Sequence, residues 1–205
     1  MAFHGLLLSS GFSSEAVREK VAAEAYKRKY TKAQIVTTAR PEKERAPWCA
    51  VTKQQLEAMG MTVTYTDFDV GESIEDTTDV VYVCGGNTFH LLYSIQQSES
   101  PIRQQVEDLC ARGGLYIGSS AGALIVAPNI IAAVELSGDR NRERIDDYQS
   151  LGCIAQHVIP HYTPSMDTEV MAFREKYGLL AKDVLLIRDG EGVYLDGGQQ
   201  TRIPS

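Results

Sequence analysis

The chain has 205 residues, of which 43% are hydrophobic and 23% are charged, the balance of a folded protein that can bury a core of its own. Its formal net charge of −7 at pH 7 argues against nucleic acid or an anionic membrane surface as the main partner. No apolar run reaches the roughly 18 residues that a membrane span needs. The first residues lack the basic start of a secretion signal, so we expect one cytoplasmic domain over residues 1–205.

Short apolar runs alternate with segments of helical periodicity from one end of the chain to the other. We predict strands at residues 5–8, 33–37, 62–65, 80–83, 115–117, 154–159, 184–187 and 192–195. Helices are predicted between them, at residues 14–30, 50–59, 88–94, 101–112, 121–127 and 166–180. Two polar segments are predicted to be loops, 40–45 and 136–147. The alternation predicts an α/β fold in which helices flank both faces of a mostly parallel sheet in a single domain.

Cysteine and histidine spacing gives no metal pattern. The four cysteines are scattered without a Cys-x-x-Cys pair: Cys49, Cys84, Cys110 and Cys153. Such thiols are expected to be free in a reducing compartment. His157 and His161 have the spacing of two ligands on one helix face, but Pro160 between them argues against a helix there. We therefore expect no metal and no cofactor.

Gly118-Ser119-Ser120-Ala121-Gly122 joins the apolar run 115–117 to the predicted helix 121–127. Gly-x-Ser-x-Gly at a strand-to-helix junction is the nucleophile-elbow pattern, because its glycines allow a turn sharp enough to expose the central serine. The backbone N–H of Ala121 would face negative charge that develops beside that serine. The pattern predicts Ser120 as a nucleophile, and a structural turn of small residues is the alternative.

A nucleophilic serine needs a base, usually a histidine that a carboxylate orients. His4 and His157 fall within predicted strand regions and His90 within a predicted helix, so we expect packing or hydrogen-bonding roles for them. His161 follows Pro160 just beyond a predicted strand. Ligands of open α/β sheets lie beyond such carboxyl ends. We therefore predict His161 as the base.

Three acidic residues are candidates for the third member. Asp189 follows the predicted strand 184–187 and leaves it at the same sheet edge, which makes it the first choice. Glu191 lies two residues further on, and Glu135 lies downstream of the elbow helix. The sequence does not decide which of these three carboxylates is the third member.

Gly85-Gly86-Asn87-Thr88 follows the predicted strand 80–83. Two glycines in succession let backbone N–H groups approach a ligand closely, as an oxyanion hole requires. The same segment can also be a tight turn in which Asn87 or Thr88 caps the next helix. Both interpretations are compatible. A dinucleotide-binding loop is not predicted, since Gly-x-Gly-x-x-Gly is absent.

Three ordered blocks of this sequence, 84–92, 115–123 and 159–163, resemble the peptidase E family of serine peptidases. The resemblance implies the class I glutamine amidotransferase-like fold, with Ser120 as nucleophile and His161 as base. It also implies an oxyanion hole from the backbone amides of Gly86 and Ala121. Asp189 occupies the position of the family's third acid, which is usually a glutamate.

Characterised members of that family are aspartyl dipeptidases, so the resemblance implies short peptide substrates, with N-terminal aspartyl dipeptides as the finer expectation. Arg174 is the nearest match to the arginine that holds the substrate carboxylate, and Asn87 is a second substrate-binding candidate. The family also has an acid near the site at the position of Glu135. Ser119 stands where the dipeptidases tend to have tryptophan. We expect a monomer or a homodimer.

Two alternatives to a peptidase follow from the same residues. One is a serine hydrolase of another ester or amide, as in α/β-hydrolases, where the acid precedes the histidine in the chain. Asp189 follows His161, and Glu135 would restore that order. The other alternative is a catalytically silent binding module on the same fold.

Overall fold

The computed structural model describes residues 3–205, and a seven-stranded sheet forms its centre. The strands follow the order β3-β2-β4-β5-β1-β8-β9. Their bounds are β1 (Gly5–Leu8), β2 (Lys32–Val36), β3 (Thr62–Thr66), β4 (Val80–Val83), β5 (Leu115–Ser119), β8 (Gly192–Asp196) and β9 (Gln199–Ile203). Neighbours from β3 to β1 are parallel, and β8 and β9 add an antiparallel edge. The predicted mostly parallel sheet is confirmed.

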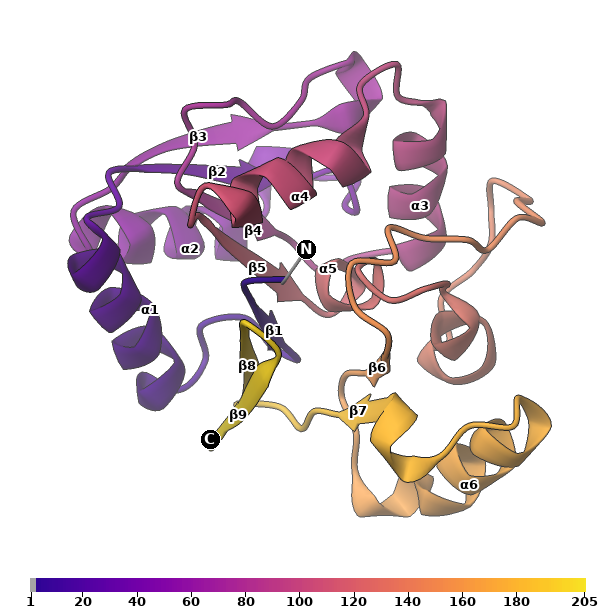
Figure 1. The fold of residues 1–205 in the computed structure, drawn as a ribbon. Coiled ribbons are helices and arrows are strands. Elements are labelled where there is room, and N and C mark those ends of the chain that lie inside the picture. The colour runs from indigo at the N-terminus through magenta and orange to yellow at the C-terminus, as the bar shows by residue number, and fades with distance from the viewer. Residues whose placement is uncertain (1–2) are drawn as a thin grey trace.

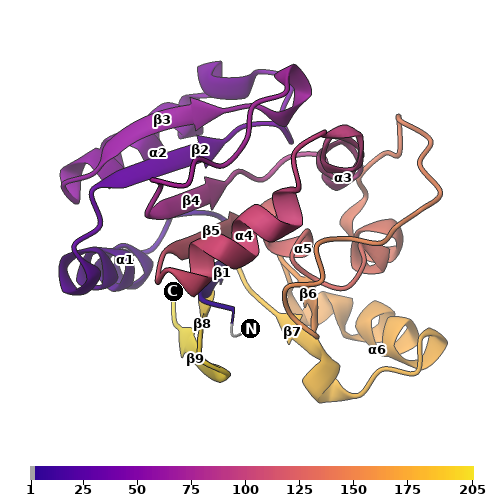
Figure 2. The same ribbon diagram turned by 45° about the horizontal axis from the view of Figure 1, so that its top comes forward.

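Helices cover both faces of this sheet, as predicted. Their bounds are α1 (Glu15–Arg28), α2 (Pro47–Ala58), α3 (Thr88–Gln97), α4 (Ile102–Ala111), α5 (Ala121–Leu124) and α6 (Asp167–Lys176). The first two lie on one face, and α3, α4 and α5 lie on the other (Figures 1 and 2). Both faces of the sheet are hydrophobic and need to be covered. In β1, Leu6 and Leu8 belong to the buried cluster on one face, and Leu7 belongs to the cluster on the other.

A smaller parallel pair, β6 (His157–Ile159) with β7 (Val184–Leu186), lies with α6 to one side of the main sheet (Figure 2). The predicted strand at 154–159 was too long, because only its last three residues pair. The predicted helix 166–180 was too long as well. It stops at Lys176, two residues before Gly178, whose φ of +65° is a left-handed conformation that ends a helix easily.

Strand β9 has no counterpart among the predicted strands. Its residues Gln199–Ile203 are mostly polar and exposed, and they lie at the edge of the sheet. Gly197 and Gly198 both have positive φ, at +59° and +87°, which is the geometry of a two-residue hairpin turn. Pairing with β8 rather than burial therefore holds this strand, and hydrophobic periodicity gives no sign of it.

The topology gathers several chain segments at one edge. Strands β1, β4 and β5 are parallel, so the residues that follow them, Ser9, Gly85 and Ser120, emerge together. Residues beyond β6 and β7 reach the same edge. The Ile187 N–H donates to the Ile159 carbonyl oxygen, which holds the ends of these two strands side by side. The site described below is built at this edge.

Buried histidines make the stability of the fold depend on pH. His4 is buried, with Nδ1 2.6 Å from the Gly114 carbonyl oxygen and Nε2 2.9 Å from the Tyr194 hydroxyl. Burial lowers the pKa of His4, and the Gly114 hydrogen bond opposes this shift without cancelling it. Burial also lowers the pKa of His157.

The free energy of unfolding is therefore expected to fall as the pH drops through about 6.5, the pKa of histidine in an unfolded chain. Below that pH the unfolded chain binds a proton at His4 that the folded protein accepts only at lower pH. Urea unfolding should show a loss of about 1 kcal/mol between about pH 7.5 and pH 5.5. His4→Gln should lose less, because glutamine does not titrate. An equal loss in both proteins would contradict a neutral, buried His4.

Candidate active site

Ser120 occupies a strained turn between β5 and α5. Its φ of +50° and ψ of −108° lie outside the ordinary regions for a residue with a side chain. The flanking glycines make the turn possible. A Cβ atom on Gly118 would lie 2.2 Å from the Gly122 carbonyl oxygen, and one on Gly122 would lie 2.3 Å from that of Val83. The sequence pattern therefore forms the sharp strand-to-helix turn that it predicts.

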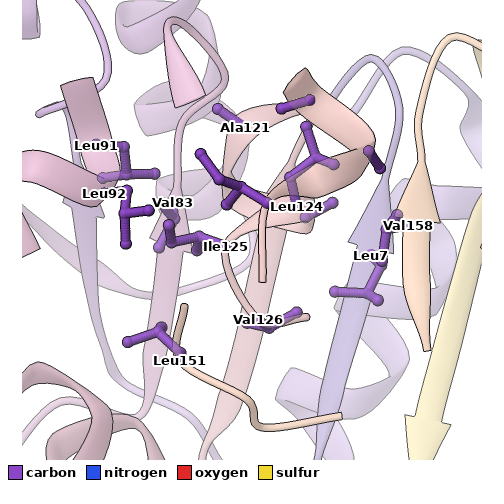
Figure 3. Close-up of a cluster of buried hydrophobic side chains, with 14 of the residues drawn as sticks. Leu7, Val83, Leu91, Leu92, Ala121, Leu124, Ile125, Val126, Leu151 and Val158 are labelled. Atoms are coloured by element: carbon purple, nitrogen blue, oxygen red, sulfur yellow. The ribbon is translucent and has the colours of Figure 1, made fainter. Parts of the chain in front are cut away.

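The short helix after this turn is held by the core. Leu124 and Ile125 pack among Val83, Leu91 and Leu92 in one buried cluster (Figure 3). The predicted helix 121–127 ends at Leu124, earlier than expected. Ser120 thus stands at the edge of a closely packed region, which limits how far its backbone can relax.

Gly122→Ala is expected to lower the free energy of unfolding by about 3 kcal/mol, because the added methyl group would overlap the β4 backbone. Gly138→Ala is the matched control. Its position has φ +71° and no atom within 4 Å of the added Cβ, so only the left-handed backbone is strained. That change should cost about 1 kcal/mol. Urea unfolding measures both, and equal losses would contradict a turn limited by backbone contact.

His161 links Ser120 to Asp189. Its Nε2 lies 3.0 Å from Ser120 Oγ, and its Nδ1 lies 2.7 Å from Asp189 Oδ1. His161 itself has φ +56°, a second strained residue at this edge. The three residues come from the ends of β5, β6 and β7, and the structure brings them into one hydrogen-bonded chain.

Ser9 supports this hydrogen-bonded series of side chains, although it was not among the predicted site residues. Its hydroxyl donates to Asp189 Oδ1 at 2.5 Å and accepts the His161 backbone N–H at 2.7 Å. Ser10 accepts the Gly190 N–H at 2.9 Å. A signal existed, since these two serines follow the first predicted strand and so lie at the carboxyl edge where ligands are expected.

The Asp189 carboxylate is stabilised in its charged form. Partial burial raises its pKa, but hydrogen bonds from Ser9 and His161 outweigh this effect, and the pKa of Asp189 is lowered. An ionised Asp189 holds His161 with its Nδ1 proton toward the carboxylate and its Nε2 free to accept a proton from Ser120.

The other two acids have different partners. Glu135 Oε1 accepts hydrogen bonds from Lys176 Nζ and from the Tyr177 hydroxyl, each at 2.8 Å. Glu191 accepts the Arg188 N–H at 3.2 Å within its own turn. Among residues 3–205, neither carboxylate is hydrogen-bonded to His161. Of the three candidate acids, Asp189 is therefore the one that is hydrogen-bonded to His161 within residues 3–205.

The Gly85-Gly86 turn lies directly against Ser120. A Cβ on Gly85 would be 2.9 Å from Ser120 Cβ, and one on Gly86 would be 2.2 Å from the Ala39 carbonyl oxygen. Gly86 has φ +155°, which only glycine adopts easily. Ala121 begins α5, where the first N–H groups have no partner within the helix.

Neither of the two predicted substrate-binding residues, Asn87 and Arg174, lines the two cavities beside Ser120. Asn87 Oδ1 accepts the His90 N–H and its Nδ2 donates to the Arg140 carbonyl oxygen, both at 2.9 Å. This side chain therefore caps α3 and holds the loop at residues 138–147 through the Arg140 carbonyl oxygen. Arg174 lies in α6 and lines neither of the cavities beside Ser120.

Two cavities open on either side of Ser120 and His161, which line both. One, of about 310 Å³, is lined by polar and apolar side chains that include Ser9, Arg40 and Trp48. The other, of about 270 Å³, is lined by both polar and apolar groups as well. Its lining includes Leu124, Val158, Ile159 and Met166. The arrangement suits an extended ligand that passes over the serine and places different groups on its two sides.

Neither metal ligation nor a membrane span is indicated in the part of the chain that the structure describes. Residues 3–205 contain no group of three or more histidine, cysteine or acidic side chains placed to hold a metal ion. No helix within that range is long and apolar enough to cross a membrane.

Known proteins similar to this chain carry peptidase names. The model of peptidase family S51 matches residues 6–203. An uncharacterized peptidase of Listeria monocytogenes is 29% identical over 170 residues, which cover 77% of this chain and 82% of the relative. Peptidase E of an Escherichia coli strain is 31% identical over 121 residues, 58% of this chain and 50% of the relative. The match therefore spans half the length of that enzyme.

Solved structures show the same fold. A Listeria monocytogenes protein named after peptidase E has a TM-score of 0.76 at 23% identity, over 98% of both chains. A peptidase from an acI-B1 actinobacterium has a TM-score of 0.63 at 18% identity, over 100% of this chain and 95% of the other. With a family model matching almost the whole length, the chain belongs to peptidase family S51, the family of peptidase E, and is a peptidase.

Proposed function

We propose that the protein is a serine peptidase that hydrolyses short peptides, with Ser120 as nucleophile, His161 as base and Asp189 as the orienting acid. The observation that carries this proposal is the hydrogen-bonded chain from Ser120 through His161 to Asp189. Its support from the family is coarser, because membership in S51 supports a serine peptidase without assigning these residues.

In the first half of the reaction, Ser120 Oγ attacks the scissile carbonyl carbon while His161 Nε2 takes the hydroxyl proton. The Asp189 carboxylate stabilises the imidazolium that forms. When the tetrahedral intermediate collapses, the C–N bond breaks and His161 returns the proton to the leaving amine. Ser120 is left as an ester of the substrate's acyl part.

In the second half, His161 takes a proton from a water molecule whose oxygen attacks this ester. The second tetrahedral intermediate expels Ser120 Oγ, which regains a proton from His161, and the acid product leaves. We propose that the backbone amides of Gly86 and Ala121 donate to the oxyanion in both intermediates. Two observations support these donors: the Gly85-Gly86 turn contacts Ser120, and Ala121 is the first residue of α5.

Cavities of about 310 and 270 Å³ favour a short peptide over a folded protein substrate. N-terminal aspartyl dipeptides are the finer proposal. The four free cysteines support a reducing compartment such as the cytoplasm.

Labelling with a fluorophosphonate probe tests the nucleophile. We expect one label on the folded protein, located on Ser120 by peptide mapping and lost in Ser120→Ala. Ser165→Ala, which removes an exposed serine, is the matched control, and this variant should still be labelled on Ser120. Absence of labelling in the folded wild type, together with no cleavage of any short peptide, would support a catalytically silent module. Labelling with ester hydrolysis but no peptide hydrolysis would support a different serine hydrolase.

A further inference from the structure

Cys49 and Cys84 lie side by side inside the protein. Their Sγ atoms are 3.7 Å apart, although 35 positions separate the two residues in the sequence. Cys49 belongs to the first turn of α2, and Cys84 follows the last residue of β4. The sulfur atoms of the other two cysteines, Cys110 and Cys153, are hydrogen-bonded to backbone carbonyl oxygens instead. The fold therefore brings one pair of thiols into direct contact.

This pair borders the larger cavity beside Ser120. Cys84 is one of the residues that line the cavity of about 310 Å³. Cys49, its neighbour, has no exposed surface of its own. A molecule as small as hydrogen peroxide can enter the cavity and reach the Cys84 sulfur, whereas a bulky thiol reagent is kept from both sulfur atoms by their burial. The pair is therefore open to a small oxidant from the side on which the peptide substrate is proposed to bind.

Joining the two sulfur atoms requires a movement of the chain after β4. A disulfide bond is about 2.05 Å long, so the two Sγ atoms need to approach each other by about 1.7 Å. Both cysteines belong to the buried cluster on the α2 face of the sheet, whereas Ala121 belongs to the cluster on the other face. The approach of Cys84 to α2 therefore draws the chain away from the start of α5.

The Gly85-Gly86 turn has little room to absorb this movement, since it follows Cys84 directly. A Cβ on Gly85 would lie 2.9 Å from Ser120 Cβ, and one on Gly86 would lie 2.2 Å from the Ala39 carbonyl oxygen. A shift of Cys84 is therefore passed on to the Gly86 N–H, the proposed oxyanion donor. Misplacing a catalytic group by about 1 Å lowers the rate by as much as about 100-fold.

We propose that a hydroperoxide oxidises Cys49 and Cys84 to a disulfide, and that this bond reversibly lowers the peptidase activity by displacing the Gly85-Gly86 turn. The effect on catalysis rests on the proposed function of Ser120, whereas the formation of the bond does not. In a reducing compartment the two thiols stay free and the turn keeps its place. Exposure to a hydroperoxide forms the bond, and exchange with a small thiol breaks it again.

The contact between the two thiols prepares them for this reaction. The hydrogen bond from Cys84 lowers the pKa of the Cys49 thiol, and the Arg40 guanidinium acts in the same direction against the effect of burial. The same contact, together with burial, raises the pKa of Cys84. After one proton has left the pair, transfer of the shared proton from Cys84 to Cys49 places the thiolate at the cavity. A thiolate of high pKa is a strong nucleophile.

Oxidation removes two electrons from the pair. The Cys84 thiolate attacks one oxygen of hydrogen peroxide and the O–O bond breaks, which leaves a sulfenic acid on Cys84 and releases hydroxide. The hydroxide takes the Cys49 proton and becomes water. The Cys49 thiolate then attacks the Cys84 sulfur, the S–O bond breaks, and the second hydroxide takes up the proton that the pair released at first. Two thiols and one hydrogen peroxide thus give one disulfide and two molecules of water.

Peptide mapping without reduction tests the bond. The folded wild-type protein is treated with hydrogen peroxide, denatured, and alkylated with iodoacetamide before digestion. We expect a cross-linked pair of peptides that holds Cys49 and Cys84, with Cys110 and Cys153 alkylated, and dithiothreitol should separate the pair. In Cys49→Ala the oxidation should stop at the sulfenic acid, so dimedone should label Cys84.

Activity is compared as the ratio of kcat before and after peroxide, so that the basal kcat of a variant does not affect the comparison. In the wild type we expect kcat for a cleavable dipeptide to fall by about 10- to 100-fold and dithiothreitol to restore it. Cys84→Ala should keep its kcat after peroxide, because the thiol at the cavity is gone. Cys153→Ala is the matched control. This thiol lies outside both cavities, so the variant should lose as much activity as the wild type.

NMR observes the turn without reference to catalysis. The backbone amide signal of Gly86 should shift on oxidation and return on reduction. The amide of Gly138, a glycine with no atom within 4 Å of an added Cβ, should stay where it is. The cross-link, its reversal and this shift are all measured on the wild type, so they need no variant to fold.

The inference is overturned if peroxide produces no cross-link between Cys49 and Cys84, or if the cross-linked protein keeps its kcat. It is overturned as well if Cys84→Ala shows the same reversible loss as the wild type, or if the Gly86 amide signal does not move. Failure of the proposed function looks different. The cross-link and the Gly86 shift would then appear, while the reduced protein neither hydrolysed a dipeptide nor reacted with a fluorophosphonate at Ser120.

Discussion

Ser120→Ala is expected to lower kcat for hydrolysis of a cleavable dipeptide by roughly 10⁶-fold, because the hydroxyl that forms the covalent intermediate is gone. His161→Ala should cost about as much, since an unactivated serine is a poor nucleophile at neutral pH. The double variant should be no slower than either single one, because the two residues act as a unit. Initial rates of dipeptide cleavage, followed by chromatography, give these values.

Ser165→Ala serves as the control for this series, since Ser165 is exposed and lines neither cavity. Its rate should equal that of the wild type. Additive losses in the Ser120 and His161 double variant would contradict a shared proton-transfer step. Near-normal turnover by Ser120→Ala would exclude Ser120 as the nucleophile altogether.

Asp189→Asn is expected to lower kcat by about 10⁴-fold while leaving the fold intact. Asparagine has the same shape, but its NH₂ group can donate to His161 Nδ1. The ring would then carry its proton on Nε2, where it cannot accept one from Ser120. Asp189 Oδ1 lies 2.7 Å from Nδ1, so the exchange acts on a direct contact. Urea unfolding checks that stability is retained.

Glu135→Gln and Glu191→Gln test the other two candidate acids in the same assay. Both should keep kcat within about 10-fold of the wild type, because neither carboxylate is hydrogen-bonded to His161. A loss in Glu135→Gln as large as in Asp189→Asn would reverse the assignment of the third member.

Ser9→Ala is expected to have a smaller effect, a fall in kcat of about 10-fold, because one hydrogen bond to a charged group is removed while His161 still contacts Asp189. The depressed pKa of Asp189 keeps this carboxylate ionised as the pH falls through the ordinary range of aspartate. Without Ser9 the pKa of Asp189 should rise, so the carboxylate loses its charge at a higher pH. The carboxyl titration, followed by NMR, measures this shift, and an unchanged pKa would contradict the role of Ser9.

Much of the site could be predicted because its signals are local in the sequence. The glycines at 118 and 122 are needed where the backbone atoms of Gly122 and Val83 come within 2.3 Å of an added Cβ. Gly86 is needed at a positive φ. His161 was favoured over His157 because it follows the strand end, and His157 is indeed buried beside Phe173. Each of these positions can be recognised from a pattern of a few residues, even where the contact that requires it comes from another strand, as at Gly122.

The residues that line the cavities were less predictable for a physical reason. Arg40 and Arg174 look alike in the sequence, and each lies in a polar surface segment. Only the stacking on Trp48 and the opening beside Ser120 distinguish Arg40. Such contacts depend on how separate loops pack at the sheet edge, and no short pattern of residues records that packing.

Local periodicity and backbone conformation were enough to predict the alternation of strands and helices, the sharp turn at Ser120 and the position of His161 beyond β6. Only the folded structure shows that Asp189 is hydrogen-bonded to His161, that Ser9 donates to Asp189, and that Arg40 lines a cavity beside Ser120. These contacts join residues up to 180 positions apart in the chain. Their formation depends on which strand ends the parallel sheet brings to a single edge, and that is settled only when the whole core has packed.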